Sequence, residues 1–150
     1  SPGLRHITVN VIVVKDSQVL LGLRSPVPGL TMLETGKWAL IGGFFDRDEN
    51  LIAAAKREVM EESGWEIDQL QLFRINDLPN RPKEDRQNVD IIFVGQAIKQ
   101  VADHDQEVKE LQWFPLDSLP PSDQIAFDHG GDLALYREHL THPQPLPIIG

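Results

Sequence analysis

The stretch Gly43–Trp65, GFFDRDENLIAAAKREVMEESGW, decides how this sequence is interpreted. Its second part has the pattern of an amphipathic helix from Leu51 to Ser63. Asn50 is a suitable N-cap, and Gly64 is a suitable left-handed terminator, because glycine adopts positive φ without steric cost. We expect the core-facing side of this helix to be formed by Ile52, Ala55 and Val59.

Three carboxylates crowd one side of the predicted helix. Glu58 and Glu62 lie one turn apart, and Glu61 lies beside them, since residues three and four apart are neighbours on a helix surface. Their repulsion destabilises the helix unless a cation neutralises it. Hard carboxylate oxygens suit Mg²⁺ or Mn²⁺, and no cysteine is present to indicate zinc. The pattern predicts divalent-metal phosphate chemistry.

The same stretch resembles the signature of the Nudix hydrolases. That signature is a glycine, five residues, a glutamate, seven residues, then Arg-Glu, an aliphatic residue, any residue, Glu-Glu, any residue, a glycine and a bulky apolar residue. A pattern this long is far more specific than a lone glycine-rich loop. The similarity extends from about residue 6 to about residue 140. Every position of the signature is filled, by Gly43, Glu49, Arg57, Glu58, Val59, Glu61, Glu62, Gly64 and Trp65.

Hydrolysis of a phosphoanhydride needs an activated water and relief of charge on the phosphate oxygens, and carboxylate-held metal ions provide both. Glu58 and Glu62 are the first candidates for direct metal ligands. Glu61 is the next, as a ligand or, in a catalytic role, through a bridging water.

Three further signature residues have expected supporting roles at the catalytic site. Arg57 would hold a carboxylate in place, and Glu49 would tether that arginine or the loop. Gly43 would let the backbone approach the substrate without an intervening side chain.

The general base lies outside the signature. The resemblance implies a further glutamate from a downstream segment, and Glu107, six residues before Trp113, is the first candidate. Glu110 is the alternative, and both residues also fit ordinary surface acids. Geometry has to come before pKa in naming a base.

Two features outside the signature favour ADP-ribose or a related nucleotide sugar. Pro79 lies fifteen residues beyond Gly64, and Ala126-Phe127-Asp128-His129 is similar to a short stretch of the ADP-ribose pyrophosphatase-like group. Three arginines are candidate phosphate ligands, because a guanidinium can fork onto a pair of oxygens. They are Arg86, Arg81 and Arg24.

The remaining strand and helix signals predict an α/β sandwich. We expect strands over 6–14, 19–24, 67–75, 89–98 and 108–114, a short strand pair or bend over 38–45, and a second helix over 132–140 on the other side of a mixed sheet. Residues 1–140 would form one domain. The Pro-rich residues 141–150 would form a loosely attached tail, unless Ile148 and Ile149 dock.

Composition limits the classes of function. The net charge of −9 argues against a sequence-independent grip on nucleic acid, which needs a basic surface. No apolar run approaches the length of a membrane span, no signal peptide is recognisable, and the absence of cysteine fits a cytoplasmic protein. The resemblance also makes a homodimer an option.

Three functions remain open. The first is a Mg²⁺-dependent pyrophosphohydrolase that cleaves ADP-ribose or another nucleotide sugar to a nucleoside monophosphate and a sugar phosphate. The second acts on a nucleoside triphosphate or an oxidised nucleotide and releases pyrophosphate. The third is a non-catalytic nucleotide-sensing module, for which a broken glutamate cluster or an attached DNA-binding domain would be expected; neither is present in this sequence.

Overall fold

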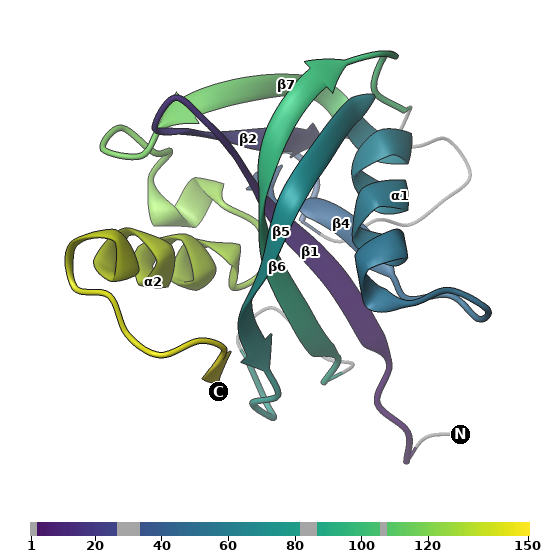
Figure 1. Cartoon of the computed structure of the whole chain (residues 1–150), viewed down its shortest axis with the longest axis vertical. Helices are drawn as coiled ribbons and strands as arrows, with labels where there is room; N and C mark the ends of the chain where they lie inside the picture. Colours follow the sequence, from purple (N-terminus) through teal and green to yellow (C-terminus); the bar gives the residue numbers. More distant parts are fainter. Residues whose placement is uncertain (1–2, 27–33, 82–86, 106–107) are drawn as a thin grey trace.

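A computed structural model describes residues 3–26, 34–81, 87–105 and 108–150. In these residues eight strands form one mixed sheet, with α1 packed on one face and α2 on the other (Figure 1). This confirms the predicted α/β sandwich. The elements are β1 (Ile7–Lys15), β2 (Gln18–Arg24), β3 (Trp38–Ala39), β4 (Ile41–Phe44), α1 (Leu51–Ser63), β5 (Trp65–Asn76), β6 (Val89–Gln100), β7 (Val108–Pro115), the 3₁₀ turn η1 (Ser122–Gln124), α2 (His129–Thr141) and β8 (Ile148–Ile149).

Strand β1 lies at the centre of the sheet and pairs along its whole length with parallel β6. Its other edge is shared. The first half pairs with antiparallel β4, in the register Val9↔Gly43 and Val11↔Ile41, and the last residues pair with β2. Strand β2 in turn pairs with antiparallel β3 and β7. The chain therefore moves from β2 to β1 as it passes from β3 to β4.

The alternation of β1 explains why its Val-Ile-Val-Val run is apolar on both faces. Val9, Val11 and Val13 point toward α1, whereas Ile12 and Val14 point toward α2, and all five side chains are buried. Each helix thus has its own apolar cluster on one face of a shared sheet.

Helix α1 has the predicted limits, because both of its ends are fixed locally. The Asn50 side chain accepts a hydrogen bond from the Ala53 N–H at 2.9 Å. Gly64 ends the helix at φ 75°, and a Cβ there would lie 2.0 Å from the carbonyl oxygen of Ala102. Both conformation and space demand glycine at this position.

One prediction for the buried face of α1 is wrong. Ile52 lies in the first helical turn and is 42% exposed, because its side chain lines an open surface hollow with Phe45 and Lys56 instead of reaching the sheet. The sheet is contacted by small residues and one valine. The buried positions of α1 are Ala54, Ala55, Val59 and Ser63.

The Pro-rich end takes the docked alternative. Ile148 and Ile149 form β8, which pairs in parallel with Arg74 and Ile75 of β5. Leu146 and Ile148 also pack against the apolar cluster beneath α2. In the described part of the chain, neither α-helix is long and apolar enough to cross a membrane.

Candidate active site

Arg57 joins the helix to the loop that precedes it. Its Nε donates to Glu49 Oε2 at 2.9 Å, and its Nη2 donates to Glu49 Oε1 at 2.7 Å, so that the guanidinium forks onto both carboxylate oxygens. The hydrogen bond from Arg57, with a further one from the Asp46 N–H, lowers the pKa of Glu49 to about 2. Glu49 is therefore ionised at neutral pH and links the loop to α1.

Arg57 also gathers the carboxylates of the signature. Its Nη1 donates to Glu58 Oε1 at 2.9 Å and to Glu61 Oε2 at 3.1 Å, and its Nη2 lies 3.3 Å from Asp46 Oδ2. Burial raises the pKa of Glu58, and the hydrogen bond from Arg57 opposes that rise. One positive charge thus faces four carboxyl groups, which leaves the cluster with excess negative charge.

The two glycines of β4 bring backbone against the glutamates of α1. The N–H of Gly42 donates to Glu62 Oε2 at 3.0 Å. A Cβ on Gly43 would lie 2.6 Å from Glu58 Oε2, and a Cβ on Gly42 would lie 2.1 Å from the carbonyl oxygen of Val9. The loop and the helix fit together only because side chains are missing at these positions.

These residues suit a hard divalent cation by their chemistry. The donors are carboxylate oxygens of one helix, and their charge is incompletely balanced by Arg57. Within the described residues, no three Asp, Glu or His side chains are placed to hold one metal ion together. Glu58 and Glu61 point to Arg57, and Glu62 points to Gly42. Binding a metal therefore requires these side chains to turn away from their present partners.

Arg24 lies apart from the signature cluster. It ends β2, and its guanidinium carbon lies 4.9 Å from the ring centroid of Phe127, a cation–π distance. Phe127 has a φ of 52°, which is uncommon for a bulky residue. The sequence suggested Arg24 and the Ala126–His129 stretch separately, and the structure brings them together.

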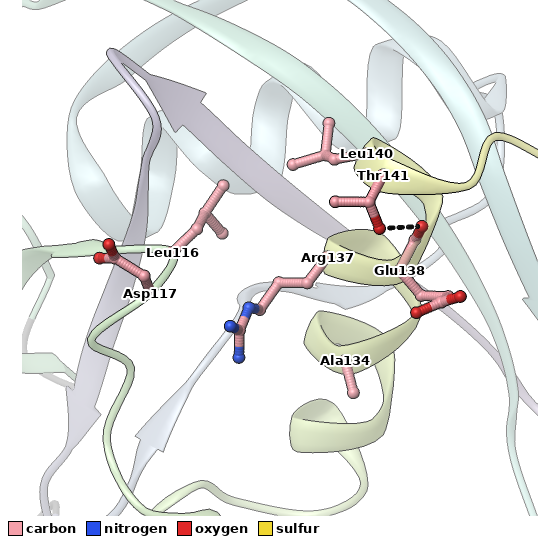
Figure 2. A pocket seen from close by; sticks show the side chains of 7 residues that line it. All are labelled: Leu116, Asp117, Ala134, Arg137, Glu138, Leu140 and Thr141. Carbon is pink, nitrogen blue, oxygen red and sulfur yellow. Dashed lines mark hydrogen bonds between the residues drawn. The ribbon is translucent and has the colours of Figure 1, made fainter.

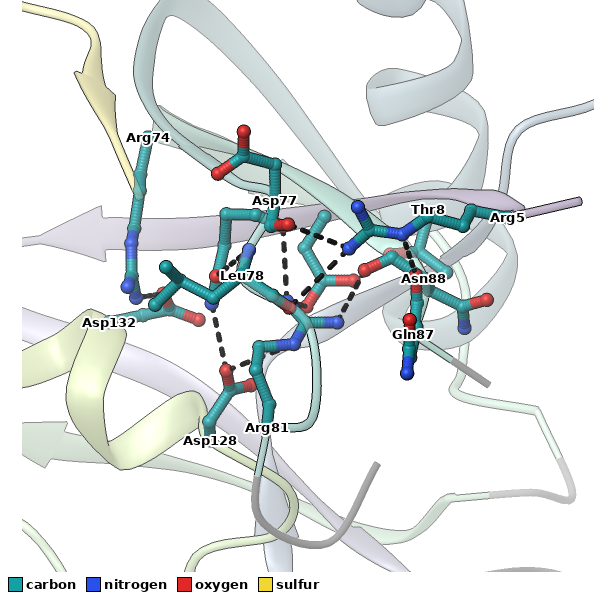
Figure 3. A network of polar contacts seen from close by, with 12 residues as sticks. Arg5, Thr8, Arg74, Asp77, Leu78, Arg81, Gln87, Asn88, Asp128 and Asp132 are labelled. Carbon is teal, nitrogen blue, oxygen red and sulfur yellow. Dashed lines mark hydrogen bonds and ion pairs between the residues drawn. The ribbon is translucent and has the colours of Figure 1, made fainter. Parts of the chain in front are cut away.

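Arg81 occupies a different position from the substrate contact that was expected. Its side chain is only 3% exposed, and its Nη atoms donate to the carbonyl oxygens of Asn76 at 3.1 Å and Asn88 at 2.6 Å. It also forms an ion pair with Asp128 at 3.6 Å (Figure 3) and another with Asp90 at 3.3 Å. Carbonyl and carboxylate oxygens of the protein itself therefore surround this guanidinium.

A second buried ion pair lies beside Arg81. Arg74 Nη1 donates to Asp132 Oδ1 at 2.7 Å (Figure 3). Arg74 also donates to the carbonyl oxygen of Gly150. Burial raises the pKa of Asp132 to about 7, against the lowering effect of Arg74. The contacts of Arg74 thus connect β5 with α2 and with Gly150.

Some predicted site residues are not placed by the structure. Arg86 and Glu107 lie outside the described residues. Glu110 is exposed on β7 and lines a hollow of about 330 Å³ together with Trp65 and His104.

A larger hollow lies on the α2 side of the molecule, away from the signature helix. It has a volume of about 430 Å³ and contains none of the predicted site residues (Figure 2). It is lined by Leu116, Asp117, Ala134, Arg137, Glu138, Leu140 and Thr141.

Sequence reasoning missed three contributors to the site. Asp46 joins the Arg57 cluster, Gly42 donates to Glu62, and His129 accepts the Leu40 N–H at 3.1 Å. The adjacent glycines in the sequence were a signal for Gly42. The contact between His129 and Leu40 joins residues 89 apart in the chain and leaves no local pattern.

Comparisons with known proteins identify the family and agree with the fold. The family model of the NUDIX domain matches residues 4–133. An ADP-ribose pyrophosphatase of Methanocaldococcus jannaschii is 30% identical over 123 residues, which are 82% of this chain and 68% of that protein. An oxidized purine nucleoside triphosphate hydrolase of Danio rerio is 31% identical over 119 residues, which are 79% of this chain and 71% of that protein. The crystal structure of a NUDIX hydrolase from Nitrosomonas europaea superposes with a TM-score of 0.80 at 26% identity, covering 97% of this chain and 77% of that one.

Proposed function

We propose that this chain, which belongs to the Nudix family and is a hydrolase of phosphoanhydride bonds, cleaves ADP-ribose or a closely related nucleotide sugar. Water would attack one phosphorus of the diphosphate, and the bridging P–O bond would break. The products would be a nucleoside monophosphate and a sugar phosphate. The observation that carries the reaction class is the carboxylate cluster that Arg57 fastens against the Gly42–Gly43 backbone.

Three observations support the choice of substrate. The relative from Methanocaldococcus jannaschii, with 30% identity, is an ADP-ribose pyrophosphatase. The sequence carries Pro79 and the Ala126–His129 stretch, which are similar to those of that group. In addition, the guanidinium of Arg24, a candidate phosphate ligand by sequence, lies over the ring of Phe127 in the same stretch.

We assign the metal ions to the carboxylates of α1. Glu58 and Glu62 would hold Mg²⁺ or Mn²⁺ directly, and Glu61 would do so directly or through water. When bound, such ions lower the pKa of water and neutralise charge on the diphosphate. The Glu49–Arg57 pair would hold the loop against α1 while Glu58 and Glu61 exchange their contacts with Arg57 for the metal.

The proton of the attacking water needs an acceptor. We assign this role to Glu107 on its position in the sequence, and Glu110 at the exposed start of β7 is the second choice. The backbone of Gly43 would face the diphosphate, because no side chain can be accommodated beside Glu58.

A second substrate class has support of similar strength. The relative from Danio rerio, which is 31% identical, is an oxidized purine nucleoside triphosphate hydrolase. Such a substrate would release pyrophosphate instead of a sugar phosphate, and therefore the products distinguish the two classes.

The test is Mg²⁺-dependent turnover on ADP-ribose, another nucleotide sugar, NADH, a dinucleoside polyphosphate, ATP and 8-oxo-dGTP, with the products separated. We expect AMP and ribose 5-phosphate from ADP-ribose, ahead of the other substrates. Preference for a triphosphate with release of pyrophosphate would overturn the substrate and keep the site. Binding of ADP-ribose without turnover of any substrate would favour the sensing module.

A further inference from the structure

The stretch Ile125–His129 is bound to the strand that leads into the active-site loop. The N–H of Ala126 donates to the carbonyl oxygen of Trp38 at 2.7 Å, and Trp38 and Ile125 form an isolated parallel bridge. Farther along both segments, the N–H of Leu40 donates to Nδ1 of His129 at 3.1 Å. The start of α2 is thereby connected to β3 and to Leu40, the single residue between β3 and β4, which we call the β3–β4 joint.

Leu40 lies where the chain changes its partner strand. Ala39 still pairs with β2, and Ile41 already pairs with β1, so that Leu40 falls between the two ladders. Leu40 is only 4% exposed. A buried N–H outside a ladder needs another acceptor, and the imidazole of His129, itself 6% exposed, provides it.

The joint at Leu40 determines where the two glycines lie. Gly42 follows two residues later and donates to Glu62, and Gly43 leaves the space that the carboxylate of Glu58 fills. Because a Cβ on either glycine would overlap its neighbours, the backbone here has little freedom to shift. A contact that fixes Leu40 therefore fixes the distance between the loop and both glutamates.

We propose that His129 is a positioning residue for phosphoanhydride hydrolysis, because its neutral imidazole holds the β3–β4 joint that sets Gly42 and Gly43 against Glu62 and Glu58. This inference rests on the proposed function for its effect on turnover. The hydrogen bond requires Nδ1 to carry no proton, so the proton of the neutral ring is on Nε2. Burial lowers the pKa of His129 to about 4, which agrees with a neutral ring at physiological pH.

The first test needs no substitution. In the ¹⁵N-labelled wild-type protein, a scalar coupling across the hydrogen bond should connect the amide nitrogen of Leu40 with Nδ1 of His129. The Nδ1 chemical shift should be that of an unprotonated ring nitrogen. A protonated Nδ1, or an amide of Leu40 that exchanges as fast as the exposed loops, would overturn the proposal whether or not any substrate is turned over.

The second test separates positioning from stability. His129→Leu removes the acceptor, whereas His129→Asn keeps an oxygen at the same branch of the side chain. We expect His129→Leu to lower kcat about tenfold or more with KM changed less than about threefold, and His129→Asn to recover most of the loss. If His129→Leu does not fold, His129→Gln, whose oxygen lies one carbon farther out, takes its place.

His139→Leu is the matched control. His139 also lies on α2, and its Nδ1 also accepts a backbone N–H, that of Gln144 at 3.2 Å, but this contact belongs to the exposed end of the helix. Its kcat should equal that of the wild type. Equal losses of kcat in His129→Leu and His139→Leu, or a loss in His129→Asn as large as in His129→Leu, would overturn the role of the acceptor.

Discussion

Two arginines on opposite faces of the sheet are surrounded by carboxylates, with opposite consequences. Arg57 on α1 is 28% exposed and faces the carboxyl groups of Asp46, Glu49, Glu58 and Glu61. Arg81 is 3% exposed and is shared between two carboxylates and two backbone carbonyls. The first cluster has negative charge left over at the surface. The second is enclosed by the protein, and its charges are paired there.

The number of acidic neighbours therefore does not identify an arginine of the proposed metal site. Solvent access and charge imbalance do, because an exposed surplus of carboxylates can recruit a cation, whereas a buried matched pair can only hold elements together. The four predictions below test this distinction, and the first concerns the buried arginine.

Arg81→Met should lower the free energy of unfolding by about 3–5 kcal/mol, because the buried Asp90 and the partly buried Asp128 would lose their ion pairs with Arg81. Urea denaturation followed by fluorescence measures the change. Arg137→Met, on the exposed face of α2, is the control and should cost little. A loss below about 1 kcal/mol for Arg81→Met would make the two arginines energetically alike and would contradict the comparison.

The buried His129 should make the free energy of unfolding depend on pH. Burial and the nearby Arg24 and Arg81 lower its pKa from 6.5 to about 4, against the opposing effect of Asp128. Because the folded pKa is the lower one, the unfolded chain takes up the proton first. The contribution of His129 is therefore present above pH 6.5 and is lost as the pH falls toward 4.

Unfolding free energies of the wild type and of His129→Asn, measured between pH 7 and pH 4, isolate this contribution. The difference between them should change in favour of the variant by on the order of 2–3 kcal/mol as the pH falls. A constant difference would show that His129 titrates normally.

Glu62→Gln should lower kcat about 100-fold or more, equivalent to about 2.7 kcal/mol, while leaving the unfolding midpoint nearly unchanged. The substitution removes a charge that a metal ion needs and keeps an oxygen for the N–H of Gly42. Glu66→Gln, an exposed position on β5, is the control. Activity within a few-fold of the wild type would remove Glu62 from the metal ligands.

Arg57→Lys should have the smallest effect, about tenfold in kcat, because a lysine keeps the charge but cannot fork onto Glu49. Steady-state kinetics with Mg²⁺ varied should show a higher metal requirement, and thermal unfolding should change little. A large loss of stability instead would place Arg57 with Arg81 among the structural arginines.

The sequence could predict what is encoded locally. Helix α1 has the predicted limits because Asn50 and Gly64 act on their own neighbours. The two-faced β1 could be read from its valine and isoleucine run. The register that brings Gly43 to Glu58 could only be expected from the resemblance, since those residues meet through the pairing of β4 with β1.

What could not be predicted depends on contacts between distant segments. Arg81 was a candidate phosphate ligand by sequence, yet its partners include Asp128, 47 residues away in the chain. His129 gave no signal for Leu40. Ile52 fits the apolar face of α1 by spacing, but the position of the first turn relative to the sheet is a tertiary property.

Because the chain passes from β2 to β1 at Leu40, the number of residues between Ala39 and Ile41 should be fixed. Side chains of a strand alternate with a period of two, so that one inserted residue between Ala39 and Ile41 would exchange the faces of the following residues. Ile41 would move into the position of Gly42, where only glycine fits, and a deletion would instead bring Phe44 into the position of Gly43. Insertions and deletions should therefore be excluded from these three residues even where every single substitution of Leu40 by another apolar residue is accepted.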